Sequence, residues 1–279
     1  MHNCPHDAML IYENGNTQLL SKLNLHVVDA FVDEPKVRDD ELQIKGMYGV
    51  QLINRAYTKR PYYLKFTFDS YDIQNLYEKR REIRAFFARL GVFRIISTLE
   101  PAISYRVQYR NMEMKREGYG DLSPVITVEF DNIDGFGEST FTSLDVKEWD
   151  SNKFAWGMGM EWDDDYNYTF KEKKFHFKNI GTMEINPAQH DIKWRIKCDP
   201  RYLKITNFTT NDSLTIYNPS AVSQGIIVIK GLHIEDEYSR NLVRHADAGE
   251  IHLVPGINQI KIESSTFHWC EIDTKFYYL

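Results

Sequence analysis

The chain has 279 residues, of which 42% are hydrophobic and 14% aromatic, and its formal net charge at pH 7 is −6. This length suits one large domain or two of ordinary size, the aromatic content favours sheets over a helical bundle, and the negative charge argues against a general nucleic-acid-binding surface. The longest aliphatic cluster, at 225–231, is far shorter than the roughly 20 residues of a membrane span, and no signal-peptide pattern opens the chain, so we expect neither secretion nor membrane insertion.

Three cysteines, Cys4, Cys198 and Cys270, are scattered along the chain. They are too few and too far apart for a disulfide framework. We therefore expect reduced thiols in a protein that is made in a cytoplasm.

The first well-marked elements are a hairpin and a strand. The stretch LQIKGMYGVQLINRAYT predicts two strands whose turn lies at Gly46 to Gly49. In the next stretch, every second residue from Tyr62 to Phe68 falls on one apolar face of an extended chain. The residues between them, such as Lys65 and Thr67, fall on the other face. This alternation predicts a half-buried strand.

The period then changes to about 3.6 residues, which predicts an amphipathic helix of about five turns. We expect Asp69 to cap its N-terminus, with Asp72 answering as a short capping box, and Gly91 to end it in the left-handed conformation. The apolar positions of this helix are Ile73, Leu76, Tyr77, Ile83, Phe87 and Leu90.

Further strands follow the helix at 92–96, 104–114 and 123–130, so the first 130 residues are predicted to form an α+β unit. Mixed glycines, acids and aromatics without a period place a domain boundary near 135–150. Beyond it, short alternating segments separated by Asp-Pro, Asn-Pro and Pro-Gly breaks predict a β-sandwich. The fold class is therefore mainly β with one long helix.

Candidates for a metal site are weak. The acidic runs at 131–138 and 162–168 do not have the spacing of a calcium loop, and solvated loops explain them better. Cys4 and His6, with His2 nearby, lack the second ligand pair of a closed zinc site. No nucleophile elbow, phosphate loop or dinucleotide fingerprint is present either. We predict no catalytic residue, no cofactor and no metal.

An aromatic cluster beside acidic residues is the best candidate for a contact surface. Flat rings next to polar groups stack on sugars or grip a protein partner, although the same rings could instead fill the seam between two domains. The cluster consists of Phe154, Trp156, Trp162, Tyr166 and Tyr168.

The order of motifs in the first half resembles the N-terminal domain of the distal tail proteins of bacteriophages with long non-contractile tails. The glycine-flanked turn Gly46-Met-Tyr-Gly49 comes first, followed by the strand from Arg60 to Phe68 and the Tyr-Asp helix from Tyr71 to Leu90. The last matching step is formed by Glu100, Pro101, Tyr105, Arg106 and Val107.

The second half is similar to the C-terminal domain of that family. The matching stretches are SLTIYNPSAVSQGIIVIKG and LVPGINQIKIE, whereas the segment 131–170 has no counterpart.

The resemblance implies a structural virion protein that forms a hexameric ring. Residues 1–140 would be the ring-forming α+β domain and residues 141–279 a galectin-like β-sandwich projecting outwards, with the last strand, Lys275 to Leu279, closing the second domain or packing back on the first. A single helix suffices on this view, because it covers one side of the sheet and leaves the sheet edges for the neighbouring copy.

The same resemblance implies the partners and the location. The ring would join the major tail tube protein to tail-tip or tail-associated proteins and to receptor-binding or baseplate proteins at the virion tail tip, after assembly in the bacterial host cytoplasm. Six chains of charge −6 carry −36, and a negative lumen would let DNA pass without specific binding.

Two other functions remain open. The predicted sandwich and the aromatic cluster are compatible with a carbohydrate-binding, lectin-like protein for host recognition. The many acidic residues of the second half are compatible with a glycosidase or another hydrolase of the host envelope. Neither has a motif of its own, so a structural protein without catalytic activity is the leading hypothesis.

Overall fold

The computed structural model describes residues 6–34, 37–43, 46, 48–146, 160, 166–218 and 225–279. The chain forms two compact units, Met1–Gly137 together with Leu279, and Glu138–Tyr278. We refer to them as unit 1 and unit 2 and describe each by itself.

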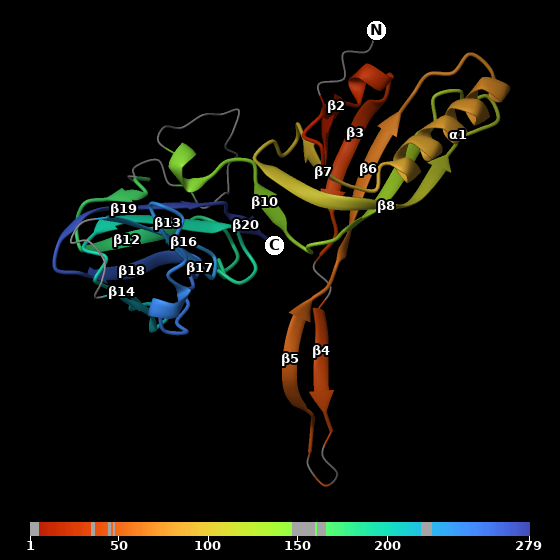
Figure 1. Ribbon diagram of the computed structural model, residues 1–279. Helices are drawn as coiled ribbons and strands as arrows, with labels where there is room; N and C mark the ends of the chain where they lie inside the picture. The colour runs from red at the N-terminus through yellow and green to blue at the C-terminus, as the bar shows by residue number, and fades with distance from the viewer. Residues whose placement is uncertain are drawn as a thin grey trace. The chain divides into compact units, whose positions relative to one another are not determined.

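Unit 1 is an antiparallel sheet carrying the only α-helix of the described residues (Figure 1). The strand order is β2-β1-β7-β8-β9-β6-β3. The bounds are β1 Ala8–Tyr12, β2 Thr17–Leu19, β3 His26–Val32, β6 Arg60–Thr67, β7 Val92–Ser97, β8 Ile103–Lys115 and β9 Val125–Asn132.

A separate two-stranded sheet, β4 (Val37–Leu42) with β5 (Gln51–Tyr57), lies between β3 and β6 in the chain. Its turn contains Gly46 and Gly49 at φ 96° and 85°, in the left-handed region where a side chain is strained. The predicted hairpin is therefore confirmed, with its turn where the two glycines lie.

The predicted half-buried strand is β6, in which Tyr62, Leu64 and Phe66 are buried. They share a core with residues of β7, β8 and β9, such as Phe93, Val107 and Phe130. The alternation read from the sequence thus decides which face of the sheet is covered.

The helix α1 (Ile73–Arg89) covers this face through Leu76 and Phe87, its two buried residues. The Phe87 ring lies 6.1 Å from that of Phe66 and 5.4 Å from that of Phe130. Gly91 follows α1 at φ 65°, as predicted for its end.

The capping prediction needs a correction. Asp72 is the N-cap, because its Oδ1 accepts the backbone N–H of Asn75 at 2.7 Å. Asp69 instead accepts the Ser123 hydroxyl at 2.9 Å, and its carbonyl oxygen accepts Lys79 Nζ. The helix therefore starts one turn later than the first acid, and Asp69 binds the loop before β9 through Ser123.

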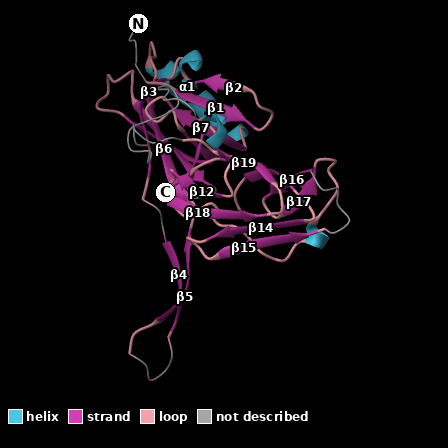
Figure 2. Ribbon diagram, turned by 90° about the vertical axis from the view of Figure 1, so that its left-hand side faces the viewer, coloured by secondary structure: helices cyan, strands magenta, loops and turns pink. Residues whose placement is uncertain are grey.

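Unit 2 contains two sheets, ordered β11-β19-β13-β16-β17 and β12-β18-β14-β15 (Figure 2). The first comprises β11 Thr169–Phe170, β13 Ile192–Cys198, β16 Gly225–Lys230, β17 His233–Asp236 and β19 Phe267–Thr274. The second comprises β12 Lys174–Asn179, β14 Tyr202–Asn207, β15 Asp212–Tyr217 and β18 Gly256–Glu263. The short strands β10 (Gly137–Ser139) and β20 (Tyr277–Tyr278) pair with each other.

The two sheets of unit 2 bury one row of side chains each. Ile192, Trp194, Ile196 and Cys198 alternate with more exposed residues along β13, as predicted, and Phe177, Ile205 and Ile260 come from the other sheet. Trp194 and Ile229 of one sheet line the same small cavity as Ile205 and Leu214 of the other. The second half is therefore a sandwich of two sheets, mainly β like the rest of the chain.

Candidate functional site

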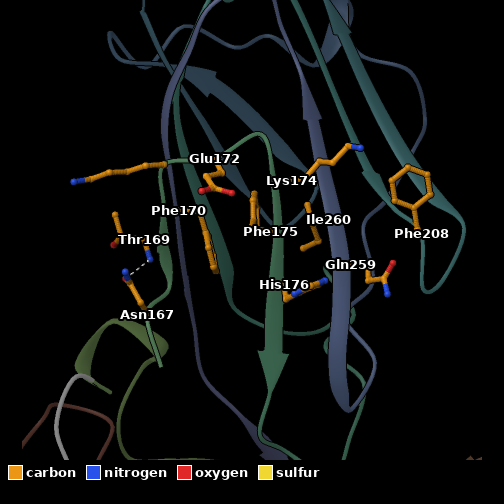
Figure 3. Close-up of a pocket in the computed structure, with 11 residues that line it drawn as sticks. Asn167, Thr169, Phe170, Glu172, Lys174, Phe175, His176, Phe208, Gln259 and Ile260 are labelled. Carbon is orange, nitrogen blue, oxygen red and sulfur yellow. Dashed lines mark hydrogen bonds between the residues drawn. The ribbon is translucent and has the colours of Figure 1, made fainter. Parts of the chain in front are cut away.

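An open pocket of about 890 Å³ lies in unit 2, where β11, β12 and β18 run close together (Figure 3). Its volume is within the roughly 300 to 1,000 Å³ of ligand pockets. The lining combines aromatic rings with charged and amide side chains: Asn167, Thr169, Phe170, Lys171, Glu172, Lys174, Phe175, His176, Phe208, Gln259 and Ile260. We call this the β12 pocket.

The floor of the β12 pocket follows from strand register. His176 of β12 lies directly opposite Gln259 of β18, and both are exposed because they alternate with buried residues such as Phe177 and Ile260. Phe208 is 53% exposed in the turn after β14, and its N–H donates to the Gln259 carbonyl at 2.9 Å.

An aromatic stack forms one side of the β12 pocket. The rings of Phe170 and Phe175 are 3.9 Å apart and only 11° from parallel. Figure 3 shows these two rings on one side of His176 and Gln259, and Phe208 on the other. The phenyl stack and the pair of His176 and Gln259 lie on opposite faces of β12, because Phe175 and His176 are consecutive residues of the strand.

These pocket residues were not singled out in the sequence. Phe170, Phe175 and His176 belong to one short segment of the predicted sandwich and Phe208 to another, and no motif marks them. Pairing of β12 with β18 and of β11 with β19 brings them together, and no local pattern encodes those pairings.

Of the aromatic cluster predicted from the sequence, Phe154, Trp156 and Trp162 lie outside the described residues. Tyr166 is half-buried, with Lys178 Nζ 5.5 Å from its ring centre. Tyr168 is only 3% exposed, and its hydroxyl donates to the Lys178 carbonyl at 2.8 Å. Because its ring packs on Phe177 and Phe276, Tyr168 belongs to the core of unit 2.

The acidic run at 131–138 holds ion pairs. Asp131 accepts Lys59 Nζ at 2.6 Å, and Asp134 accepts Arg106 at 3.1 Å. The run at 162–168, and Cys4 with His2, fall wholly or largely outside the described residues. Within the described part of the chain, no group of three or more His, Cys, Asp or Glu side chains is arranged to hold a metal ion.

A second candidate surface lies on unit 1, at the sheet end formed by β3 and on the β4–β5 hairpin. The strand order ends at β3, so its outer edge has no ladder partner among the described strands. Apolar side chains are exposed along the same stretch, including Ile53 at 64%. We call them the hairpin surface: Val28, Phe31, Leu42, Tyr48, Val50 and Ile53. Apolar side chains beside an open strand edge are typical of a protein–protein contact.

A buried polar cluster lies at the base of the hairpin. Arg60 begins β6 and is 4% exposed, and its Nη1 donates to the Asp33 carbonyl beyond β3 at 3.5 Å. Burial lowers the pKa of Arg60. Burial raises the pKa of Glu100, while the hydrogen bond from Tyr105 and the positive charge of Arg60 act in the opposite direction. Tyr105 donates to Glu100 at 3.0 Å. The cluster joins β3, β6 and β8 at the point where the hairpin leaves the sheet.

The residues of unit 1 match a known protein family. Residues 14–139 match the family model of the phage tail protein RIFT-related domain. The strands β2 to β9, the hairpin and α1 all fall within the matched residues.

The whole chain is similar to the solved structure of the Dit protein (gp 19.1) of SPP1, described as a paradigm of the hub adsorption apparatus in phages that infect Gram-positive bacteria. The sequence identity is 12%, the TM-score is 0.66, and the match covers 98% of this chain and 99% of that one. The resemblance to distal tail proteins indicated by the sequence is thereby confirmed at the level of the fold.

Two further solved structures match with lower scores. They are the baseplates of phage P2 in the activated conformation with Ca and with Sr, at 12% identity and TM-scores of 0.39 and 0.38, each covering 97% of this chain and 98% and 97% of the other. Comparison with curated protein sequences found no match.

No helix in the described part of the chain has the length and hydropathy needed to cross a membrane.

Proposed function

We propose that this protein is the distal tail hub of a long-tailed bacteriophage, a structural protein without catalytic activity. The single observation that carries the proposal is the match of residues 14–139 to a phage tail domain. The fold shared with the SPP1 Dit protein over nearly the full length of both chains supports the hub as the kind of tail protein.

On this proposal, copies of unit 1 close into a ring, six in number as the resemblance to the family implies. A closed ring requires two different patches on each copy. The sheet of unit 1 offers two unlike ends, the three-residue strand β2 and the seven-residue strand β3 with its hairpin surface. Pairing at an open strand edge combined with burial of apolar side chains would hold neighbouring copies together.

The remaining assignments are part of the same proposal. Residues 1–140 are the ring-forming domain and residues 141–279 a galectin-like sandwich, a division supported by the compact units that meet between Gly137 and Glu138. The ring joins the tail tube protein to tail-tip, baseplate or receptor-binding proteins at the virion tail tip, after assembly in the host cytoplasm. Its summed charge of −36, six times that of one chain, favours passage of DNA without specific binding.

The aromatic residues Phe154, Trp156, Trp162 and Tyr166 remain proposed contacts for a sugar or a protein partner. Tyr168 is left out of this set because its ring is buried in the core.

The test is the oligomeric state of the full chain by native mass spectrometry and negative-stain imaging. The wild-type protein should give closed annular oligomers. Ile53→Glu should reduce them to monomers, since it places a charge on the hairpin surface. Ile257→Glu is the matched control, because Ile257 is 59% exposed on β18 of unit 2 and has no role in the proposed ring.

Monomers of the wild type at micromolar concentration over a range of salt would refute the proposal. Rings that persist in the Ile53→Glu variant and disappear in the Ile257→Glu variant would show that the subunit interface lies on unit 2 and not on the hairpin surface.

A further inference from the structure

We propose that the β12 pocket binds an acidic saccharide, a sugar ring that carries a phosphate or carboxylate group. The proposal goes beyond the hub function, because a ring joining tail proteins does not require a ligand pocket. It rests on three features of the pocket: an excess of positive charge, with two lysines against one glutamate, ring surfaces at both of its ends, and both donors and acceptors for hydroxyl groups.

The charge is the first feature. Lys171 and Lys174 line the pocket, and neither makes an ion pair within the described part of the chain. Lys174 lies directly opposite Lys261 in the β12–β18 ladder, an arrangement that destabilises a sheet. Lys261 is paired with Glu263 at 2.7 Å, so Lys174 is the cation of this pair that lacks a counter-charge. An anionic group bound beside Lys174 would relieve the repulsion.

The ring surfaces are the second feature. The exposed ring of Phe208 lies beside Gln259, whereas the Phe170–Phe175 stack lies at the other end of the pocket, on the opposite face of β12 from His176 (Figure 3). Phenyl rings offer flat apolar faces, and the C–H face of a pyranose ring packs on such surfaces while its hydroxyl groups point to polar side chains. An inorganic anion alone would leave these rings unused.

The third feature is the mixture of hydrogen-bonding groups. The Glu172 carboxylate is an acceptor for sugar hydroxyl groups, and the Gln259 amide offers both a donor and an acceptor. Figure 3 shows Glu172 beside the phenyl stack and Gln259 on the Phe208 side, so each end of the pocket has both a ring surface and a hydrogen-bonding group. A purely anionic ligand would be repelled by Glu172, which favours a ligand with hydroxyl groups at that end.

The test is binding of four small probes to the full chain, measured by saturation-transfer NMR and titration calorimetry. The probes are glucose 1-phosphate, glucuronic acid, glucose and inorganic phosphate, each at about 10 mM, where a ligand with a millimolar Kd is largely bound. We expect the first two to bind at least about tenfold more tightly than the last two, since a charge-assisted hydrogen bond and a ring contact act together only in them. The stronger of the first two identifies the acidic group.

Three variants locate the site. Lys174→Ala should weaken binding of glucose 1-phosphate about tenfold. Phe208→Ala, in an exposed turn, should weaken it severalfold without altering the fold. Lys115→Ala is the control, because Lys115 is an exposed strand lysine of unit 1 without an ion pair in the described part of the chain, and binding should not change.

Absence of binding by all four probes, equal affinity for glucose and glucose 1-phosphate, or an unchanged affinity of Lys174→Ala would overturn the proposal. Inorganic phosphate binding as tightly as glucose 1-phosphate would overturn the saccharide part of it. Repeating the measurement on the Ile53→Glu variant separates the outcome from ring assembly, since the β12 pocket lies entirely within unit 2.

Discussion

Replacing Phe87 of α1 tests how the helix is held on the sheet of unit 1. The side chain is fully buried and its ring contacts those of Phe66, Phe86 and Phe130 at centroid distances of 6.1, 5.2 and 5.4 Å. Removing a buried phenylalanine ring costs about 3 to 5 kcal/mol, and the higher helix propensity of alanine returns roughly 0.5 kcal/mol. We therefore expect Phe87→Ala to lower the free energy of unfolding of unit 1 by about 3 to 4 kcal/mol.

Phe86→Ala is the matched control on the same helix. Phe86 is only half-buried, and its ring packs edge-on against that of Phe87. A loss of about 1 to 2 kcal/mol is expected, because less apolar surface becomes exposed.

The assay is urea unfolding followed by far-ultraviolet circular dichroism and by tryptophan fluorescence. All five tryptophans lie in the second half of the chain, and none lies between residues 1 and 137, so fluorescence reports on unit 2 alone. With an m-value of about 2 kcal/mol/M, Phe87→Ala should shift the dichroism midpoint of unit 1 by about 1.5 to 2 M and leave the fluorescence midpoint unchanged.

A shift for Phe87→Ala no larger than that for Phe86→Ala would refute the reasoning, since it would mean that the helix is not packed through Phe87. An equal shift in both signals would show that the two units unfold as one.

Two further changes test single side chains. Asp72→Ala should destabilise unit 1 by about 1 kcal/mol in the same unfolding assay, because the N-cap bond to Asn75 is lost. Asp69→Ala should leave the helicity measured by circular dichroism nearly unchanged. A larger effect of Asp69→Ala than of Asp72→Ala would show that Asp69 is the cap. Burial lowers the pKa of His190 from 6.5, so the unfolded chain binds this proton more readily, and the stability of unit 2 should fall as the pH drops below 6.5. His190→Gln should make this loss of stability at low pH shallower when unfolding is followed by fluorescence. His176→Gln, at an exposed position, is the control. Parallel pH profiles of the two variants would show that His190 is not the group responsible.

The physical basis of the His190 prediction is visible in its contacts. Its Nδ1 accepts the backbone N–H of Asn186 at 2.9 Å, and its ring stacks on Tyr277 at 4.0 Å. Protonation of Nδ1 removes the acceptor, so the folded protein favours the neutral ring.

The sequence by itself determined the local elements. Alternation from Tyr62 to Phe68 predicted β6 and its buried face, the change of period predicted α1, and the glycines at 46 and 49 predicted the hairpin turn. These succeed because helix and strand periods and positive φ are properties of a few neighbouring residues. The order of motifs also sufficed to suggest the phage tail family, which the match to residues 14–139 supports.

Only the tertiary structure decided which side chains are available to a ligand or partner. Nothing in the sequence distinguishes Tyr166 from Tyr168. Tyr168 is nevertheless in the core, because its ring packs on Phe177 and on Phe276, which is far away in the chain. The β12 pocket likewise requires β12 to pair with β18, some 80 residues later, and its lysine without a counter-charge is evident only when Lys174 and Lys261 are seen opposite each other.

The hairpin surface has the same origin. Apolar residues such as Val50 and Ile53 have the pattern of ordinary strand residues, and nothing local distinguishes them from those that become buried. They are exposed because β4 and β5 pair only with each other among the described strands, while β3 ends the sheet. Strand pairing over long sequence separations, and not the composition of any one segment, therefore sets where this protein can meet another molecule.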